Sequence, residues 1–264
     1  TIMVFVASCL FGMERFVAED IDALGYKRLE TIDGRVSFEA PMDAVARCNV
    51  FFRYAERLFI KLAEFDAYTF DDLFEGVKAI PWANYIGKTD AFPVKGHAIK
   101  SKLFSIPDCQ RIVKKAVVES LKSAYNESYF EETGATVQIE FFILKDKASV
   151  MIDTTGTGLH KRGYRPVANA APLRETLAAA MVSLSRPREG VLTVDPMCGS
   201  GTIPIEAALL CTNTAPGINR SFAGEKLPFI DGKLWTAARE EALSAVKPWN
   251  GEIYGFDIDP ECVE

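Results

Sequence analysis

The chain has 264 residues, of which 48% are hydrophobic and 25% are charged, and its formal net charge is -6 at pH 7. This length allows more than one hydrophobic core. No apolar run approaches the roughly 18 residues that a membrane span needs, and residues 1–10 lack the basic leader of a signal peptide. We therefore expect a cytoplasmic protein without a membrane partner.

Cysteine and histidine residues are few and scattered. The six cysteines form no CxxC pair, and there are only two histidines. This pattern argues against a zinc site and against a disulfide framework. We expect reduced thiols and no metal.

Residues 1–64 predict a ferredoxin-like unit with the order β-α-β-β-α-β. Apolar residues recur at helical spacing from Met13 to Leu24 and are followed by Gly25, a good helix terminator. Asp33 and Gly34 lie between two alternating stretches and predict a hairpin. The expected strands are 2–7, 26–32, 35–40 and 57–65, and the expected helices are 13–24 and 41–52.

Residues 65–156 predict a second α+β unit. Thr69 is placed to cap a helix over 69–80, and residues 105–125 have the strongest helical periodicity of the chain. Residues 91–100 are expected to be extended, and two apolar stretches around residues 145–147 predict a hairpin. The glycines of residues 154–166 then indicate a connector.

Residues 157–264 change to an α/β pattern. We expect a helix over 172–185, with Pro172 in its first turn, and a helix over 202–211. Residues 191–194 and 252–257 predict short buried strands. The predicted fold is thus an α+β region in two units, followed by the first part of a Rossmann-like α/β domain.

The stretch DPMCGSGT, residues 195–202, joins the first of these strands to its helix. A phosphate-binding P-loop needs a lysine after its last glycine, but Thr202 and Ile203 follow Gly201. A dinucleotide loop needs a third glycine where Pro204 stands, which weakens that alternative. The third candidate is S-adenosylmethionine, whose amino-acid end requires a tight turn, a helix N-terminus and an acid such as Asp195.

A second acid follows the next predicted strand. Asp257 is placed to accept hydrogen bonds from the ribose of such a cofactor, although a plain unit has this acid roughly 20 residues after the loop. Residues 211–252 intervene here. The alternatives are Asp259 in the ribose role, or an ordinary turn carboxylate at Asp257.

Positive charge is concentrated in two segments of this acidic chain. Residues 93–125 carry seven basic and two acidic residues, and residues 160–174 carry no acid. Local positive charge attracts a polyanion even when the total is negative. The first segment gives a candidate RNA surface at Lys100, Lys102, Arg111, Lys114 and Lys115, and the connector gives candidates at Lys161, Arg162, Tyr164 and Arg165. The alternatives are a solvated helix face for the former and docking of one domain on the other for the latter.

Several motifs together resemble a known family. DTTGTGLHKRGYR, PLRETLAAAMV, DPMCGSGTIPIEAALL, APGINR and YGFDIDP are similar to the THUMP-domain RNA methyltransferases, in particular the RlmL type of large-subunit rRNA guanine-N2 methyltransferase. FGMERFVAEDIDALG, FFRYAERLFI and DLFEGVKAIPW extend the resemblance through the N-terminal region. It implies a ferredoxin-like unit at 1–64, a THUMP RNA-binding domain at 65–156, and an incomplete class I methyltransferase domain at 157–264.

The resemblance also implies site residues, a cofactor and a partner. S-adenosylmethionine is the expected cofactor, and RNA, most specifically large-subunit rRNA, is the expected partner. The catalytic loop of the family has the form Asn-Pro-Pro-Tyr, and this tetrapeptide does not occur in the sequence, so the catalytic residues stay unknown. The expected cofactor-binding residues are Asp195, Pro196, Cys198, Gly199, Ser200, Gly201, Thr202, Asp257 and, in the helix before the first strand, Thr176.

The implied reaction is attack of an exocyclic base nitrogen on the cofactor's methyl group, with the base single-stranded or flipped out of a duplex. Two other functions stay open at this point. One is a non-catalytic RNA-binding module with a vestigial cofactor fold, and the other is adenine-N6 methylation of DNA.

Overall fold

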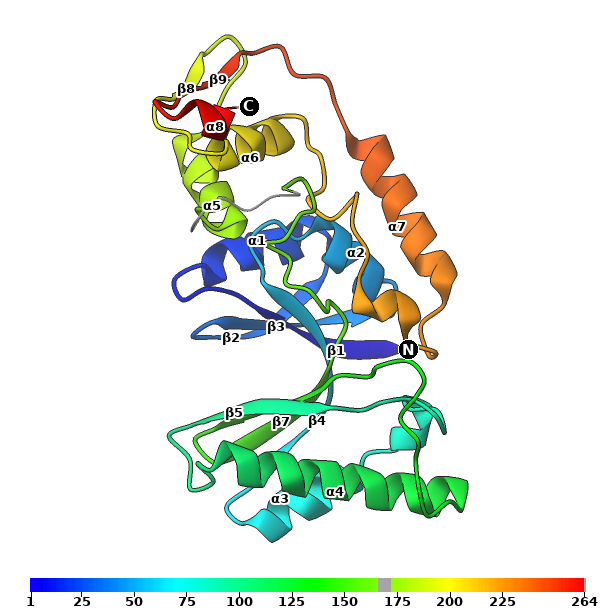
Figure 1. Cartoon of the computed structure of the whole chain (residues 1–264). Helices are drawn as coiled ribbons and strands as arrows, with labels where there is room; N and C mark the ends of the chain where they lie inside the picture. Colours follow the sequence, from blue (N-terminus) through cyan, green and yellow to red (C-terminus); the bar gives the residue numbers. More distant parts are fainter. Residues whose placement is uncertain (166–171, 264) are drawn as a thin grey trace.

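The computed structural model describes residues 1–165 and 172–263 (Figure 1). Seven strands of the N-terminal half form one sheet in the order β2-β3-β1-β4-β7-β6-β5, and β8 and β9 pair separately. The strands are β1 (Ile2–Ser8), β2 (Lys27–Ile32), β3 (Arg35–Pro41), β4 (Arg57–Asp66), β5 (Val94–Ile99), β6 (Ile139–Leu144), β7 (Lys147–Asp153), β8 (Thr193–Asp195) and β9 (Ile253–Gly255). The α-helices are α1 (Glu14–Ala23), α2 (Ala44–Phe51), α3 (Phe70–Lys78), α4 (Ile106–Tyr125), α5 (Glu175–Ser185), α6 (Thr202–Cys211), α7 (Gly232–Ala245) and α8 (Pro260–Val263).

The ferredoxin-like order of the first unit is confirmed, from β1 through α1, β2, β3 and α2 to β4. Leu24 caps α1, and Gly25 follows with a φ of +82°, a conformation that glycine adopts without strain. Thr69 caps α3 through a reciprocal capping box with Asp72. The local signals of the sequence therefore mark the element ends well in this half.

The two N-terminal units share one continuous sheet, which the sequence did not predict. Strands β4 and β7 pair antiparallel and join the units edge to edge. Paired residues such as Phe5, Ile60 and Ile152 all belong to the main core. Helices α1 to α4 contribute residues to this same core, so they cover the face that carries these residues, and none of the described helices covers the other face.

The sheet is strongly curled around its helix-free face. Strands β3 and β6 are four positions apart, which corresponds to about 19 Å in a flat sheet. Nevertheless, the Arg35 guanidinium on β3 lies 4.0 Å from the centre of the Phe142 ring on β6. Figure 1 shows the helices outside the two halves of the sheet and the helix-free face between them. A small second apolar cluster lies in this inner space, with Val6, Phe59, Phe142 and Met151.

The C-terminal part is attached to the ferredoxin-like unit by the long insertion between α6 and β9. Within it, Phe222 stacks on Trp235 of α7 at 5.4 Å between ring centres. Helix α7 then packs on α2, where Arg47 donates two hydrogen bonds of 2.8 Å to Glu241. The insertion is therefore a docking element, which explains how the loop and its acid can be so far apart in sequence.

The start of α5 differs from expectation. Helix α5 begins at Glu175, and Arg174 is its N-cap in an extended conformation. Pro172 therefore lies before the helix rather than in its first turn. Its place outside the helix becomes important for the site below.

Candidate functional site

The glycine loop, residues 196–201, lies at the carboxyl ends of two parallel strands. Strands β8 and β9 pair in register, and their last pair is Asp195 with Gly255. The Phe256 N–H donates to the Asp195 carbonyl at 2.8 Å, and the Cys198 N–H donates to the Phe256 carbonyl at 2.8 Å. The loop and the segment after β9 are thus adjacent at one sheet edge, where α/β folds bind ligands.

Asp257 contacts the glycine loop directly. Its Oδ2 accepts a hydrogen bond from Gly199 N at 2.8 Å, and its Oδ1 accepts one from Asp259 N at 3.0 Å. The hydrogen bonds from Asp259 and Gly199 lower the pKa of the Asp257 carboxyl, which keeps it ionised at neutral pH. A carboxylate has about four lone-pair positions, so Asp257 retains acceptors for ligand hydroxyls.

The Asp259 carboxylate caps a helix instead of contacting the loop. Its Oδ1 accepts a hydrogen bond from Glu261 N at 3.0 Å, so this carboxylate starts the short helix α8. This arrangement favours Asp257 over Asp259 for contact with a ligand at the loop. The ribose role of Asp257 stays a prediction.

The turn depends on glycines at three positions. Gly199 and Gly201 have φ values of +54° and +82°, which favour glycine. At Gly255 in β9, a Cβ atom would lie 3.0 Å from the Cys198 sulfur, so a side chain would push the loop away from its strand. The result is a tight loop that places the N-terminus of α6 toward the sheet edge, a favourable end for a negative group.

A cavity of about 270 Å³ adjoins this loop. Burial raises the pKa of the Cys198 thiol, so this residue lines the cavity as a neutral thiol. Of the expected cofactor residues, Pro196 and Gly201 lie in the loop itself and Asp257 binds its backbone. The cavity is lined by Pro172, Leu173, Asp195, Met197, Cys198, Gly199, Ser200, Thr202, Ile203 and Cys262.

Thr176, which was expected to bind the cofactor, does not line this cavity. Thr176 is fully buried, and its Oγ1 donates to Glu56 Oε1 at 2.7 Å, outside the cavity. The cavity is instead lined by Pro172 and Leu173, which run beside the loop before α5 begins. This segment therefore contributes its apolar start, rather than the Thr176 hydroxyl, to the cavity lining.

Glu56 connects the ferredoxin-like unit to the start of α5. Its Oε2 lies 2.9 Å from Arg174 Nη1 and 2.9 Å from His160 Nδ1, while its Oε1 binds Thr176. Burial alone would raise the pKa of Glu56, but the hydrogen bonds from His160 and Thr176 lower it overall. An ionised Glu56 therefore holds the segment that carries Pro172 and Leu173.

Two other kinds of site are not seen in the described part of the chain. Its helices include none with the length and apolarity that a bilayer crossing requires. Nor do residues 1–165 and 172–263 bring together three or more His, Cys, Asp or Glu side chains as a metal site would need.

Comparisons with known families match three consecutive segments of the chain. Residues 4–59 match the RlmL ferredoxin-like domain, and residues 67–153 match the THUMP domain. Residues 162–264 match the RMKL-like methyltransferase domain. These segments follow the three units described above.

YpsC of Bacillus subtilis, whose name assigns it provisionally to the RNA methyltransferases, is 46% identical over 264 residues. The match covers 98% of this chain and 68% of YpsC. The chain belongs to the RlmL-like family of THUMP-domain RNA methyltransferases. Its fold is accordingly a ferredoxin-like unit and a THUMP domain followed by a class I methyltransferase fold.

One further sequence relative and one solved structure are also similar to this chain. The ribosomal RNA large subunit methyltransferase K/L of Aliivibrio salmonicida is 35% identical, and the match covers 96% of this chain but 37% of that protein. The crystal structure of SMU.472, whose description assigns it provisionally to the methyltransferases and which is complexed with SAH, superposes with a TM-score of 0.92 at 41% identity. That superposition covers 99% of this chain and 70% of SMU.472.

The structure corrects part of the expectation that the connector residues 161–165 contact RNA. Only 1% of the Arg162 side chain is exposed, and its Nε lies 3.2 Å from Glu206 Oε1 on α6. Tyr164 donates to the same carboxylate oxygen at 2.9 Å, and burial followed by the charge of Glu206 raises its pKa. Arg162 therefore connects α6 to the N-terminal half, because its Nη2 also donates to the Arg53 carbonyl at 2.6 Å, and it does not reach a surface that RNA could touch. The Tyr164 hydroxyl is held by α6.

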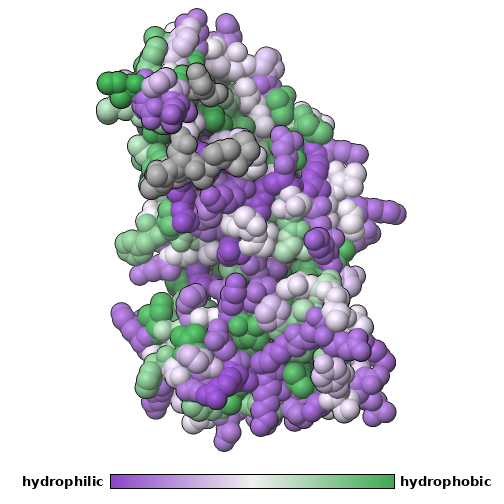
Figure 2. Space-filling model, in the orientation of Figure 1, coloured by the Kyte–Doolittle hydropathy of each residue, from purple (hydrophilic) through white to green (hydrophobic). Residues whose placement is uncertain are grey.

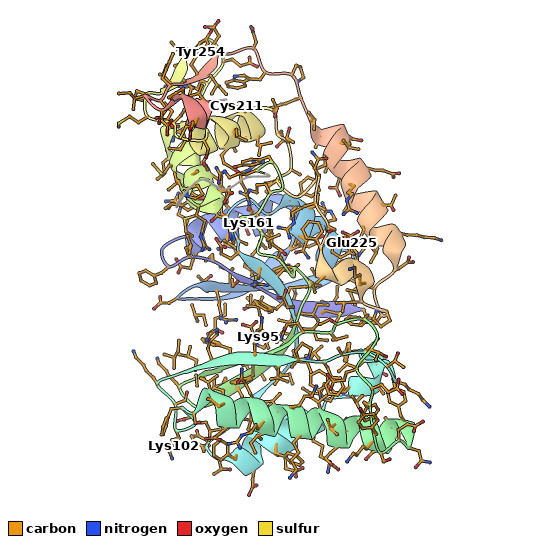
Figure 3. The ribbon with its side chains drawn as sticks, in the orientation of Figure 1. Lys95, Lys102, Lys161, Cys211, Glu225 and Tyr254 are labelled. Atoms are coloured by element: carbon orange, nitrogen blue, oxygen red, sulfur yellow. The ribbon has the colours of Figure 1, made fainter. Side chains whose placement is uncertain are left out.

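Arg165 also has an internal role. It pairs with Glu175 at 3.1 Å and donates to the Thr202 hydroxyl at the start of α6. The remaining connector residue, Lys161, is exposed and lies between the N-terminal half and the methyltransferase part in Figure 3. Of the four connector candidates, Lys161 is thus the one whose side chain is most accessible to RNA, and its RNA contact stays a prediction.

The basic residues of the THUMP domain divide into two groups. Arg111 pairs with Asp108, and Lys114 pairs with Glu132 and donates to the Phe92 carbonyl at 3.0 Å. These two charges are neutralised within the fold. Lys100, Lys102 and Lys115 are exposed and form no ion pair with the residues that the structure describes, so they stay candidates for RNA contact.

Proposed function

We propose that this protein is a cytoplasmic S-adenosylmethionine-dependent RNA methyltransferase whose target is an exocyclic base nitrogen, namely guanine N2 of large-subunit rRNA. The hydrogen bond between Asp257 and Gly199 carries this proposal, because it brings an ionised acid to the glycine loop at the carboxyl edge of β8 and β9. The names of YpsC and of the K/L methyltransferase, and the SAH complex of SMU.472, support it.

The residues present fit this cofactor. The positive φ values of Gly199 and Gly201 leave a turn without side chains, and the N-terminus of α6 would hold the cofactor's carboxylate. Asp195 would face its ammonium group, and Asp257 would accept from its ribose hydroxyls. When bound, the cofactor supplies a methyl group on a sulfonium, which a base nitrogen can attack. The cavity residues Pro172 and Leu173 would exclude water from one side of it.

An exocyclic base nitrogen is a weak nucleophile because its lone pair is delocalised into the ring. Catalysis therefore depends on holding that nitrogen in line with the methyl group. A base inside a duplex cannot reach the cavity, so the target must be single-stranded or flipped. We assign no catalytic residue among those described.

The test uses full-length protein with S-adenosylmethionine labelled in its methyl group. Unmodified large-subunit rRNA and duplex DNA are offered in parallel, and the labelled nucleoside is identified after digestion. Label on N2 of guanosine in rRNA supports the proposal. Label on DNA alone would indicate adenine methylation of DNA. RNA binding without saturable cofactor binding would indicate a non-catalytic RNA-binding module.

A further inference from the structure

Arg165 joins the starts of the two helices that flank the cofactor cavity. Its Nη1 lies 3.1 Å from Glu175 Oε1, at the first residue of α5. Its Nη2 donates a hydrogen bond to Thr202 Oγ1, at the first residue of α6. Helices α5 and α6 pack side by side (Figure 1). A planar guanidinium suits this position because its donors point in fixed directions, toward both helices at once.

Thr202 faces the cofactor cavity, and Arg165 lies behind it. Thr202 is 4% exposed and is one of the residues that line the cavity of about 270 Å³ beside the glycine loop. Arg165 is not among the described residues that line this cavity. It lines a second cavity of about 290 Å³, together with Glu175. Arg165 therefore acts on a ligand at the loop through Thr202 rather than by direct contact.

The start of α6 is an unusual place for a cation. The first turn of an α-helix carries partial positive charge, so it favours anions and disfavours cations. The N-cap of α6 is Gly201, and no side chain in the described part of the chain caps this helix. Glu175 offsets part of the cost, because its carboxylate and the Arg165 guanidinium are both well buried against each other. A carboxylate bound at the start of α6 would complete this set of charges.

The second cavity is strongly basic. Besides Arg165 it is lined by Lys161, Arg162 and Arg220, and Glu175 is the one acid among the described residues that line it. Arg162 is neutralised by a carboxylate of α6, whereas Arg220 donates to backbone carbonyls. Figure 2 shows hydrophilic residues across this level of the molecule, where Figure 3 labels Lys161. Positive charge that the internal pairs do not cancel favours an anionic group near the start of α6.

The hydrogen bond from Arg165 decides how the Thr202 hydroxyl can act. A hydroxyl has one donor and two acceptor positions. Because the guanidinium occupies an acceptor position, the hydroxyl hydrogen points away from Arg165. No group in residues 1–165 and 172–263 accepts a hydrogen bond from this hydroxyl. It is therefore left to donate toward the cavity that Thr202 lines.

We propose that Arg165 is a positioning residue for the cofactor, because it orients the Thr202 hydroxyl to donate a hydrogen bond to the carboxylate of the cofactor's amino-acid end. This inference rests on the cofactor assigned in the proposed function. It gives Arg165, a candidate RNA contact by its sequence, a role in cofactor binding. Arg162 binds Glu206 one turn further along α6, so the connector holds this helix at two points.

The test measures the binding of two ligands to full-length protein by titration calorimetry. S-adenosylhomocysteine carries the amino-acid end, whereas methylthioadenosine has the same adenosine and thioether without it. We expect Arg165→Met to weaken binding of S-adenosylhomocysteine by about tenfold, the effect of one hydrogen bond to a charged group. Binding of methylthioadenosine should change less than about twofold, since it has no carboxylate. A merely structural role would weaken both, because a displaced loop affects both ligands.

A double-variant cycle tests the route through Thr202. Thr202→Val removes the hydroxyl but keeps the branched shape, and it should show the same ligand-selective loss. The double variant Arg165→Met, Thr202→Val should lose little more than either single variant, because both act through one hydrogen bond. Thr202→Ser keeps the hydroxyl and should bind S-adenosylhomocysteine as wild type does. Arg239→Met is the matched control, since Arg239 on α7 pairs with Glu225, and both affinities should be unchanged.

Three outcomes would overturn the positioning role. They are an unchanged affinity for S-adenosylhomocysteine in Arg165→Met, equal losses for the two ligands, and fully additive losses in the double variant. Thr202→Val alone decides the question if Arg165→Met does not fold, because equal losses for both ligands in that variant would also contradict it.

Failure of this inference and failure of the proposed function give different results. If wild-type protein binds S-adenosylhomocysteine saturably and Arg165→Met binds it equally well, only the positioning role of Arg165 fails. If wild-type protein binds no S-adenosylhomocysteine, the cofactor assignment fails, and the positioning role fails with it.

Discussion

Asp257 and Gly199 are 58 residues apart in sequence and are joined by a hydrogen bond of 2.8 Å from the Gly199 N–H to the carboxylate. This contact closes the glycine loop against the end of β9. The insertion between α6 and β9 packs on α2 through its helix α7. The chain after it forms β9, which pairs in parallel with β8, so Asp257 lies beside the loop. The loop is therefore shaped by two distant segments.

Replacement of Asp257 should weaken cofactor binding with little effect on stability, because this carboxylate is near the surface. In Asp257→Ala, both the ribose acceptor and the bond to Gly199 are lost, so we expect affinity for S-adenosylhomocysteine to fall about 10- to 100-fold. Titration calorimetry measures this. Asp259→Ala is the control and should change affinity less than threefold; an unchanged affinity in Asp257→Ala would remove Asp257 from the site.

Glu56→Gln, a change in the ferredoxin-like unit, should weaken cofactor binding in the cavity. The neutral amide weakens the contacts to Arg174 and His160, so the segment with Pro172 and Leu173 becomes less well held. Loss of charge-assisted hydrogen bonds predicts about tenfold weaker binding of S-adenosylhomocysteine. Affinity for RNA should be unaffected. Glu64→Gln, which removes a carboxylate paired with Lys61 on β4, is the control, and equal losses in both variants would contradict a specific role for Glu56.

The buried pair of Arg162 and Glu206 should be important for domain docking. Glu206→Gln leaves the Arg162 guanidinium buried opposite a neutral group, which predicts a loss of about 3–5 kcal/mol in unfolding free energy. The double variant Arg162→Met, Glu206→Leu should recover at least half of that loss, because it removes both charges. Urea denaturation followed by fluorescence checks this. Glu19→Gln breaks the exposed pair with Arg15 and should cost less than about 1 kcal/mol.

The sequence predicted most elements because their signals are local, although α7 in the insertion was not among them. Gly25 and Thr69 mark helix ends, and the glycines of residues 195–202 mark the turn between β8 and α6. The single sheet formed through β4 and β7 could not be foreseen, because pairing between the edges of two units leaves no local pattern. The same limit applies to the curl that brings Arg35 onto Phe142.

In the site, too, local features could be predicted from the sequence and long-range contacts could not. The loop and Asp257 were identified from strand ends and composition, and the structure joins them. Arg162 was expected to be exposed because residue type does not reveal the direction of a side chain, and the Thr176 hydroxyl likewise lies outside the cavity lining. A basic residue in an acid-free segment looked exposed, but its partner Glu206 is on a helix 44 residues away. Such long-range pairs require the fold.

Asp20 on α1 should make stability depend on pH. Its side chain is partly buried, and its Oδ2 accepts from Arg53 N at 2.8 Å. Burial raises the pKa of Asp20 from 3.8 to about 6, against the opposing effects of the Arg53 hydrogen bond and the charges of Arg53 and Arg162. Because the folded pKa is the higher one, the native state holds a proton that the unfolded chain releases between these two values. Stability from this group therefore rises as the pH falls from 7 toward 4 and stays constant below that.

The measurement compares the unfolding free energy of wild type with that of Asp20→Asn at pH 7 and pH 5. Asparagine keeps an acceptor for Arg53 N but does not titrate. Wild type should gain about 1 kcal/mol relative to Asp20→Asn on going from pH 7 to pH 5, while other titrating groups cancel in the difference. Asp22→Asn, at an exposed residue paired with Arg28, is the control and should show no such gain. A difference between wild type and Asp20→Asn that is the same at both pH values would show that Asp20 does not take up a proton in this range.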